Sequence, residues 1–207
     1  FDMIVESFLA SAKGPRPDMA VLGVAGPVRR GQAAVTNLPW RLDERALCAR
    51  HSLASVLLVN DLVATSVGAM HTPPRGLIQL TPRAPRPKGN HLAVIAAGTG
   101  LGEARLLWDG ARHLAFGSEG GHIDFAPRTP LQVELWEYLR GRQEGHVSYE
   151  RVASGSTIAA LYTFFVRDQR VRESPKAASY VARAPDQNVA VVELATKGTS
   201  EAAMRAS

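Results

Sequence analysis

Glycines surround an acidic residue and a histidine in the segment Gly117–Phe125, which places Glu119 and His122 in one tight turn. These two side chains form either a structural pair across the turn or part of a ligand site. A metal site is disfavoured, because no second histidine lies at ligand spacing and the turn is not one face of a helix. A sugar fits better, since each of its adjacent hydroxyls both donates and accepts hydrogen bonds and therefore suits carboxylates and imidazoles together.

A second glycine-rich turn follows the apolar run 91–96, a predicted buried strand, and contains Gly98, Thr99, Gly100 and Gly102. Glycines cluster in this way either in a strand-to-strand turn that needs positive φ or in a phosphate loop. In a phosphate loop the backbone N–H groups reach the anion, and the Thr99 hydroxyl adds a donor. The segment is not a Walker loop, because no lysine follows its last glycine.

Asn60 and Asp61 lie where a predicted strand meets a predicted helix, a position at which many α/β proteins bind ligands. In one interpretation Asp61 caps the helix and accepts a hydrogen bond from a backbone N–H of its first turn. In the other, Asp61 is a general base that takes a proton from a substrate hydroxyl, and Asn60 orients that substrate.

Glu150 lies in the polar segment 145–155, for which we predict the start of a short helix with Ser148 as its cap. A carboxylate near the positive end of a helix is stabilised by the helix dipole, which is a sufficient structural reason for Glu150. Structural roles are also preferred for Asp124, His146 and Arg151.

The elements that position these residues alternate between strands and helices. Helices are predicted at 2–13, 43–51, 61–70, 130–142 and 157–168, strands at 19–26, 32–36, 55–59 and 91–96, and a hairpin at 103–108 and 112–116 around Asp109-Gly110. This order indicates an α/β domain with a mixed sheet, in which polar residues at strand ends are site candidates.

Prolines at 73, 74, 82, 85 and 87 separate two halves of the chain and surround a short apolar piece, 76–80, that we predict as an edge strand. The predicted division has four parts: the remainder of an N-terminal α/β domain at 1–70, the proline-rich connection at 71–90, a larger α/β domain with both glycine-rich turns at 91–170, and a weakly defined tail at 171–207. The tail is alanine-rich and only loosely periodic.

Composition excludes several classes of protein. The chain has 207 residues, 45% of them hydrophobic and 21% charged, which suits a globular protein. Its net charge of +5 comes from dispersed residues without a basic block or a binding motif, so we expect no nucleic-acid partner. The single cysteine, Cys48, excludes disulfide frameworks and cysteine-rich zinc sites. No apolar run is long enough to cross a bilayer and no signal peptide opens the chain, so we expect a cytoplasmic protein without a membrane partner.

Six segments together resemble the bacterial glucokinase family, which comprises ATP-dependent hexose kinases. The segments occur in the family's order and at similar spacing, and they are Ala25–Val28, Thr36–Trp40, Val59–Asp61, Ala97–Gly102, Gly117–Pro127 and His146–Gly155. The resemblance implies a two-domain kinase with the actin/hexokinase-like (ribonuclease H-like) ATPase fold. The cysteine-rich zinc motif of the related repressor and sugar-kinase family is absent, which favours the glucokinase branch.

The resemblance also implies a role for each candidate residue. Asp61 corresponds to the catalytic base, and hydrogen bonds to the hydroxyls of D-glucose come from Asn60, Glu119, His122 and Glu150. Gly98, Thr99, Gly100 and Gly102 correspond to the second phosphate-binding loop, with ATP and Mg²⁺ as the implied cosubstrate and ion. The implied reaction is transfer of the γ-phosphate to the 6-hydroxyl of glucose, giving glucose 6-phosphate. The oligomeric state stays open, with a homodimer as one option.

The chain departs from the family at three places. No glycine-rich hairpin with the first phosphate loop precedes Phe1, and nothing after Asp168 matches the strand and helix that hold adenosine. We therefore expect a fragment that lacks both ends, with a non-catalytic sugar-binding fragment as the alternative to an active kinase. Ser156-Thr157 replaces the proline and glycine usual after Ser154-Gly155.

Overall fold

The computed structural model describes residues 1–36, 38–81, 89–142, 145–169 and 171–207. Asn37, and three of the prolines in the predicted connection, at 82, 85 and 87, lie outside the described residues. The chain divides into two compact units. The first comprises Phe1–Val94 and Ala104–Gly117, and the second comprises Ile95–Glu103 and Ser118–Ser207.

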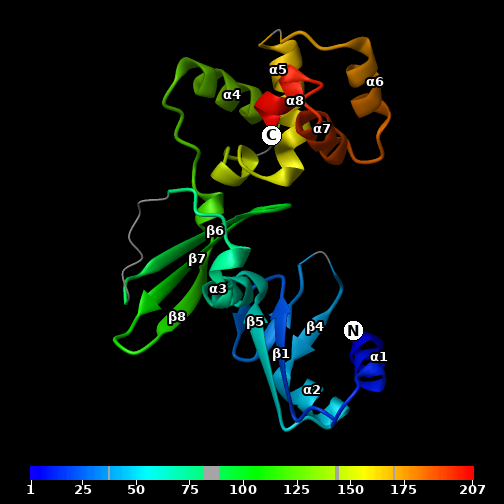
Figure 1. The fold of residues 1–207 in the computed structure, drawn as a ribbon, viewed down its shortest axis with the longest axis vertical. Coiled ribbons are helices and arrows are strands. Elements are labelled where there is room, and N and C mark those ends of the chain that lie inside the picture. The colour runs from blue at the N-terminus through cyan, green and yellow to red at the C-terminus, as the bar shows by residue number, and fades with distance from the viewer. Residues whose placement is uncertain (37, 82–88, 143–144, 170) are drawn as a thin grey trace. The chain divides into compact units, whose positions relative to one another are not determined.

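Most predicted elements of the first unit are confirmed (Figure 1). Its helices are α1 (Asp2–Ser11), α2 (Glu44–His51) and α3 (Asp61–His71), and its strands are β1 (Met19–Val24), β2 (Val28–Arg29), β3 (Gln32–Ala34), β4 (Arg41–Asp43) and β5 (Ser55–Asn60). Sequence reasoning missed β2 and β4, because strands of two or three residues are too short to show alternation. The predicted edge strand at 76–80 is wrong. Pro74–Gly76 forms a 3-10 turn instead, and Ile78 and Leu80 are exposed.

The parallel pair of β1 and β5 places two chain segments at one edge of their sheet. The register runs from Met19 opposite Ser55 to Val24 opposite Asn60. The carboxyl ends of parallel strands lie together, so the Gly26 turn after β1 lies beside the start of α3. Strands β2, β3 and β4 form a separate antiparallel sheet, and the β2–β3 hairpin turns through Arg30 and Gly31 with positive φ at both positions.

The core of the first unit lies beneath these strands and α2. Its buried side chains are Val24, Ala33, Leu42, Leu47, Leu53, Val56 and Leu58. Helix α1 is joined to α2 by polar contacts, since Asp2 pairs with Arg50 and lies 3.1 Å from Nε2 of the buried His51. The ring of Phe1 packs edge-on against Trp40 at 5.4 Å.

A third sheet has the strand order β6 (Leu92–Ala97), β7 (Leu101–Trp108) and β8 (His113–Ser118). The predicted strand at 91–96 and the predicted hairpin are thereby confirmed, but the prediction that this strand is buried is wrong, because Leu92 and Ile95 are exposed. Asp109 closes the hairpin by accepting hydrogen bonds from the backbone N–H groups of Ala111 and Arg112, each at 2.8 Å. The ring of Trp108 lies 5.0 Å from that of His113.

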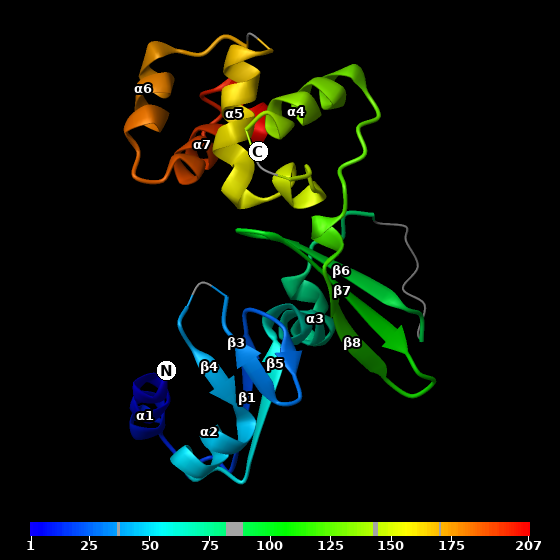
Figure 2. The same ribbon diagram turned by 180° about the vertical axis from the view of Figure 1, so that it is seen from behind.

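The second unit is mainly helical (Figures 1 and 2). Its helices are α4 (Pro130–Arg140), α5 (Ile158–Arg167), α6 (Pro175–Arg183), α7 (Gln187–Thr196) and α8 (Glu201–Ala206). The first two confirm the predicted helices, with α4 and α5 packed around Phe125, Tyr138, Leu139 and Phe164. The guanidinium of Arg140 lies 4.8 Å from the ring of Trp136 on α4.

The tail at 171–207 contains defined structure that sequence periodicity did not reveal. Helices α6, α7 and α8 pack with α5 around small side chains, including Ala190, Ala202 and Ala203. Helix α7 lacks an amphipathic pattern, whereas α6 has a clear one that sequence reasoning did not recognise. Their caps were the available evidence in the sequence: Ser174, Asp186 and Ser200 each accept a hydrogen bond from a backbone N–H in the first turn of the helix that follows.

Candidate functional site

The junction of β5 and α3 holds Asn60 and Asp61. Asn60 is the cap, because its Oδ1 accepts hydrogen bonds from the backbone N–H groups of Leu62 and Val63 at 3.1 and 3.3 Å. Its Nδ2 donates to the carbonyl of Gly26 at 3.2 Å. The predicted cap is therefore one residue too late, although Asp61 does accept a hydrogen bond from an N–H of the first turn, that of Leu62.

Asp61 is the first residue of α3 and is exposed. Its Oδ1 accepts hydrogen bonds from Asn60 Nδ2 at 3.0 Å and from the N–H of Leu62 at 2.9 Å. No hydrogen bond to Oδ2 is formed within the described part of the chain. One oxygen is thus anchored while the other is available to accept a proton.

The turn after β8 brings Glu119 and His122 together. Gly120–His122 forms a 3-10 turn, in which the N–H of His122 donates to the carbonyl of Glu119 at 3.0 Å. His122 Nε2 lies 3.6 Å from Glu119 Oε2, and His122 Nδ1 lies 3.9 Å from Glu150 Oε1. Both separations exceed a direct hydrogen bond, so the imidazole lies near two carboxylates without being hydrogen-bonded to either.

The three side chains of this cluster differ in their exposure to solvent. The side chain of Glu119 is 85% exposed, that of His122 57% and that of Glu150 25%. Glu150 is therefore the most buried of the three side chains and Glu119 the most exposed. The three residues, each predicted from the sequence, are brought together within the second unit.

Neighbouring residues hold this turn in place. His146 Nε2 donates to the carbonyl of His122 at 2.7 Å, and the N–H groups of Phe125 and Tyr149 bond the carbonyls of Val147 and Ile123 at 2.8 and 3.0 Å. His146 thus has the structural role expected for it.

The glycine-rich turn Gly98–Gly100 connects β6 to β7 and exposes two backbone donors. The N–H of Gly98 donates to the carbonyl of Gly100 at 2.8 Å, and the N–H of Leu101 donates to Glu150 Oε2 at 2.9 Å. Among the described residues, no acceptor bonds the N–H groups of Thr99 and Gly100 or the Thr99 hydroxyl. Consecutive unpaired N–H groups of this kind form an anion-binding concavity.

Glu150 does not lie at the start of an α-helix. Tyr149–Arg151 is a single 3-10 turn, and Ser148 makes no capping hydrogen bond with its side chain. The partner of Glu150 is instead the Leu101 N–H, 49 positions away in the chain. Its two carboxylate oxygens therefore face different turns, Oε2 the glycine-rich turn at 98–100 and Oε1 the imidazole of His122.

Sequence reasoning missed two contributors to these turns. The Glu103 carboxylate lies against Gly120, where a built Cβ would come within 1.9 Å of Glu103 Oε2. The segment Ser154–Ser156 bonds the glycine-rich turn, since the N–H of Gly155 donates to the carbonyl of Gly98 at 2.7 Å. Gly155 was the available clue, because glycine often marks a close backbone approach.

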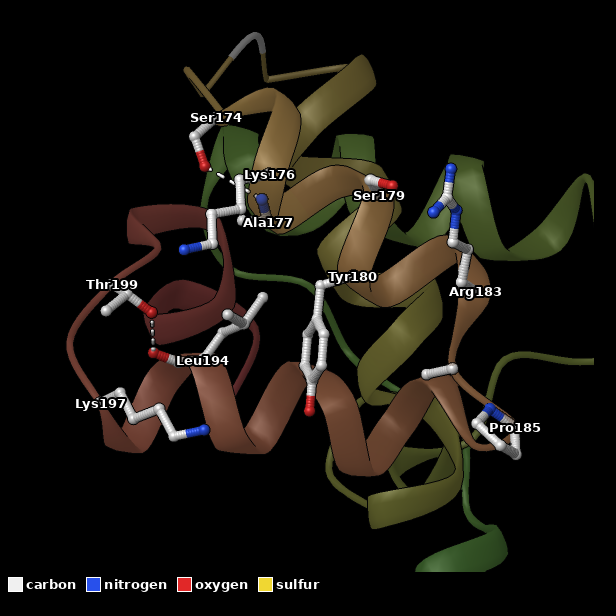
Figure 3. Close-up of a pocket in the computed structure, with 11 residues that line it drawn as sticks. Ser174, Lys176, Ala177, Ser179, Tyr180, Arg183, Pro185, Leu194, Lys197 and Thr199 are labelled. Atoms are coloured by element: carbon white, nitrogen blue, oxygen red, sulfur yellow. Dashed lines mark hydrogen bonds between the residues drawn. The ribbon is translucent and has the colours of Figure 1, made fainter.

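A pocket of about 760 Å³ lies elsewhere in the second unit, between α6 and α7 (Figure 3). Tyr180 stands in it beside Leu194, and its hydroxyl bonds Glu193. None of the sequence-predicted site residues lines this pocket. Within the described ranges, no group of three or more His, Cys, Asp or Glu residues is arranged to hold a metal ion, and no helix is long and apolar enough to cross a membrane.

Comparison with known proteins points to one family. The family model described as Glucokinase matches residues 1–206, so the likeness to the family extends past Asp168, where sequence reasoning found no match. A glucokinase from Nostoc punctiforme is 38% identical over 180 residues, which cover 86% of this chain and 52% of that protein. A glucokinase from Synechocystis is 37% identical over 190 residues, covering 89% and 53%. The chain thus spans about half the length of the curated relatives it matches.

Solved structures agree on the fold. Glucokinase from an Antarctic psychrotroph superposes with a TM-score of 0.77 at 27% identity, covering all of this chain and 60% of that one. Glucokinase from Balamuthia mandrillaris, solved in complex with glucose, superposes with a TM-score of 0.70 at 23% identity and the same coverage. The predicted α/β fold of the hexokinase-like ATPase type is confirmed.

Proposed function

The chain belongs to the glucokinase family, and from that membership and the two turns of its second unit we propose that it acts in transfer of the γ-phosphate of ATP to the 6-hydroxyl of D-glucose. The observation that carries the proposal is Glu150. Its carboxylate accepts a hydrogen bond from the Leu101 N–H, directly after the glycine-rich turn, and faces the imidazole of His122. Glu150 therefore connects the proposed phosphate site to the proposed sugar site.

The sugar site is formed by Glu119, His122 and Glu150. Vicinal hydroxyls of a hexose both donate and accept, so an imidazole between two carboxylates offers them matched partners at the 3.6 and 3.9 Å separations. Asn60 supplies a further amide, although its Oδ1 already caps α3. A sugar whose hydroxyl points the wrong way leaves these groups unpaired, so we expect galactose to bind at least about 10²-fold more weakly than glucose.

The phosphate site is the turn Gly98–Gly100. The N–H groups of Thr99 and Gly100 and the Thr99 hydroxyl would donate to phosphate oxygens of ATP and stabilise the charge on them. Gly102, at the start of β7, completes the glycine pattern. Mg²⁺ would enter with the nucleotide, since it is usually bound through substrate phosphates and one or two carboxylates.

Asp61 is the proposed general base. Its anchored Oδ1 fixes the carboxylate, and Oδ2 would accept the proton of the sugar 6-hydroxyl as that oxygen attacks the γ-phosphate.

The test combines calorimetry of glucose binding with an assay of glucose-dependent ADP formation by the 207-residue chain. We expect Asp61→Asn to reduce turnover by at least about 10²-fold, the lower end for loss of a general base, while glucose affinity changes little. Asp18→Asn is the matched control, because Asp18 is an exposed acid of the same unit.

Three outcomes are distinct. Turnover that is lost in Asp61→Asn and kept in Asp18→Asn supports the kinase. Glucose binding without any ADP formation supports sugar binding alone, the second candidate. A folded chain that does not bind glucose contradicts both.

A further inference from the structure

We propose that Gly155 and Ser156 are positioning residues that set the direction of the two phosphate-binding amides in the turn Gly98–Gly100. The proposal rests on the proposed function, in which this turn binds phosphate. Two hydrogen bonds carry it: the N–H of Gly155 donates to the carbonyl of Gly98 at 2.7 Å, and the N–H of Ser156 donates to the carbonyl of Thr99 at 3.3 Å.

Peptide planarity converts these two bonds into an orientation of the turn. In a trans peptide, the C=O of one residue and the N–H of the next lie in one plane and point in opposite directions. Holding the Gly98 carbonyl toward Gly155 therefore directs the Thr99 N–H away from the segment 154–156. Holding the Thr99 carbonyl toward Ser156 does the same for the Gly100 N–H.

The two amides so directed have no internal acceptor within the described part of the chain, whereas the next one, Leu101, donates to Glu150. The segment 150–156 thus bonds two of the three carbonyls of the turn and the N–H of Leu101 that follows it, and leaves two adjacent donors for a ligand. The N–H groups of Gly98 and Leu101 bond acceptors within the protein, and those of Thr99 and Gly100 would bond the anion.

Gly155 has a steric reason to be glycine. A Cβ built on it would lie 2.9 Å from the carbonyl oxygen of Gly98, a backbone atom that cannot rotate away. Alanine at 155 would therefore push the two segments apart and release the Gly98 carbonyl, with little effect on residues outside this contact.

Ser156 contributes a bond that proline cannot make. Proline is the residue that the family resemblance leads one to expect here, and it has no N–H to donate to Thr99. The Ser156 hydroxyl lies 3.0 Å from that of Ser154, whose own side chain is buried. In this chain the glycine-rich turn is held by two backbone bonds where proline at 156 would leave one.

The experiment is a titration of the ¹⁵N-labelled 207-residue chain with inorganic pyrophosphate, followed through the amide signals of Thr99 and Gly100. The variants are Gly155→Ala, Ser156→Pro and Ser156→Ala, which keeps the N–H. The control is Gly141→Ala, because a Cβ at Gly141 meets only an ordinary contact at 3.6 Å. Glucose affinity is measured for every variant as a readout that general unfolding would also reduce.

We expect pyrophosphate to bind about tenfold more weakly to Gly155→Ala and about three- to tenfold more weakly to Ser156→Pro, the range for loss of one hydrogen bond. Ser156→Ala and Gly141→Ala should bind as the parent does, and glucose affinity should stay within about twofold throughout. Ser156→Pro keeps the test decisive if Gly155→Ala does not fold. In the parent chain, we expect the amides of Gly155 and Ser156 to exchange with solvent more slowly than those of Thr99 and Gly100.

The failures are separable. If pyrophosphate shifts the two amides in the parent and binds equally well to Gly155→Ala and Ser156→Pro, the positioning role is overturned while the proposed function stands. If pyrophosphate binds nowhere near Thr99 and Gly100 in the parent, the phosphate role of the turn fails, and this proposal fails with it. Slow exchange at Thr99 and Gly100 in the free chain would also overturn it.

Discussion

The two glycine-rich turns of the second unit use glycine for different purposes. In the turn at 98–100, a Cβ on Gly98 would meet nothing within 4 Å, and a Cβ on Gly100 would meet only the end of the Glu150 side chain, at 2.6 Å from Oε2. In the turn at 119–122, a Cβ on Gly121 would lie 2.2 Å from the carbonyl oxygen of Leu101, so the backbone is packed tightly against β7. One turn offers its backbone to a ligand, and the other buries its backbone to present side chains.

The difference explains where the chemistry lies in each turn. Thr99 and Gly100 contribute N–H groups, which any residue can supply if the backbone is held in position. Glu119 and His122 contribute ionisable side chains, which only these residue types can supply. Glycine content alone therefore does not distinguish a phosphate loop from a platform for side chains, whereas the surroundings of each Cα do.

Alanine substitutions at Gly121 and Gly98 should show the largest difference between the two turns. We expect Gly121→Ala to lower the free energy of unfolding by about 1–3 kcal/mol, as overpacking against a fixed backbone atom does. Gly98→Ala should change it by less than about 1 kcal/mol, because the site is open. Urea denaturation of both variants measures the contrast, and equal effects would show that the two turns do not differ in packing.

Ligand affinities should divide between the turns. We expect His122→Ala to weaken glucose binding about tenfold and leave pyrophosphate binding unchanged, because it removes one hydrogen-bonding side chain from the sugar cluster. Thr99→Ala should do the reverse, with a smaller loss of about two- to fivefold, since the backbone donors stay. Calorimetry with each ligand provides the measurement, and His71→Ala, on an exposed helix position of the first unit, is the control.

A single variant that weakened both ligands equally would contradict this division, unless the variant was Glu150→Gln. Glu150 contacts both turns, so its neutralisation is the one change expected to weaken both.

This division of roles requires an intact second unit, and Tyr162 is a buried group in that unit whose ionisation would destabilise it at alkaline pH. Burial, and next the Glu173 carboxylate, raise the pKa of Tyr162 above its usual value, and its hydroxyl is buried without a hydrogen-bond partner in the described residues. A raised pKa in the folded state means that its contribution is complete below the unfolded value of about 10 and is lost as the pH rises through the folded value.

We therefore expect thermal stability to fall above about pH 10 and this fall to be reduced in Tyr162→Phe. At pH 7 the same variant should change the free energy of unfolding by less than about 0.5 kcal/mol, because an unpaired buried hydroxyl contributes little. Melting curves across the pH range measure both effects. A large loss of stability in Tyr162→Phe at pH 7 would show that the hydroxyl is paired.

The fold was predictable wherever apolar periodicity was strong. The parallel strands β1 and β5 and the helices α4 and α5 bury large aliphatic or aromatic side chains at regular spacing. Helix α7 was not predicted because it has no amphipathic pattern, and α8 because it buries only alanines; α6 is amphipathic, and its pattern was overlooked. The apolar run at 76–80 led to a wrong strand prediction. Ile78 and Leu80 are exposed, and the residue types alone do not distinguish an exposed apolar segment from an edge strand.

The candidate site was predictable in its residue types but not in its connections. Glu119 and His122 are three residues apart, so their proximity follows from the turn itself. The bond between Glu150 and the Leu101 N–H joins positions 49 residues apart and depends on the tertiary fold. Which of Asn60 and Asp61 holds the cap position is likewise a matter of side-chain geometry, since both residue types are good caps.

The tryptophans are intrinsic fluorescent probes that report on the two units separately. Trp40 and Trp108 belong to the first unit and Trp136, stacked under Arg140, to the second. A chain with Phe at 40 and 108 would emit from the second unit alone, and one with Phe at 136 from the first alone. Comparing their denaturation curves would reveal whether the sugar and phosphate turns melt independently of the strand pair that carries Asp61.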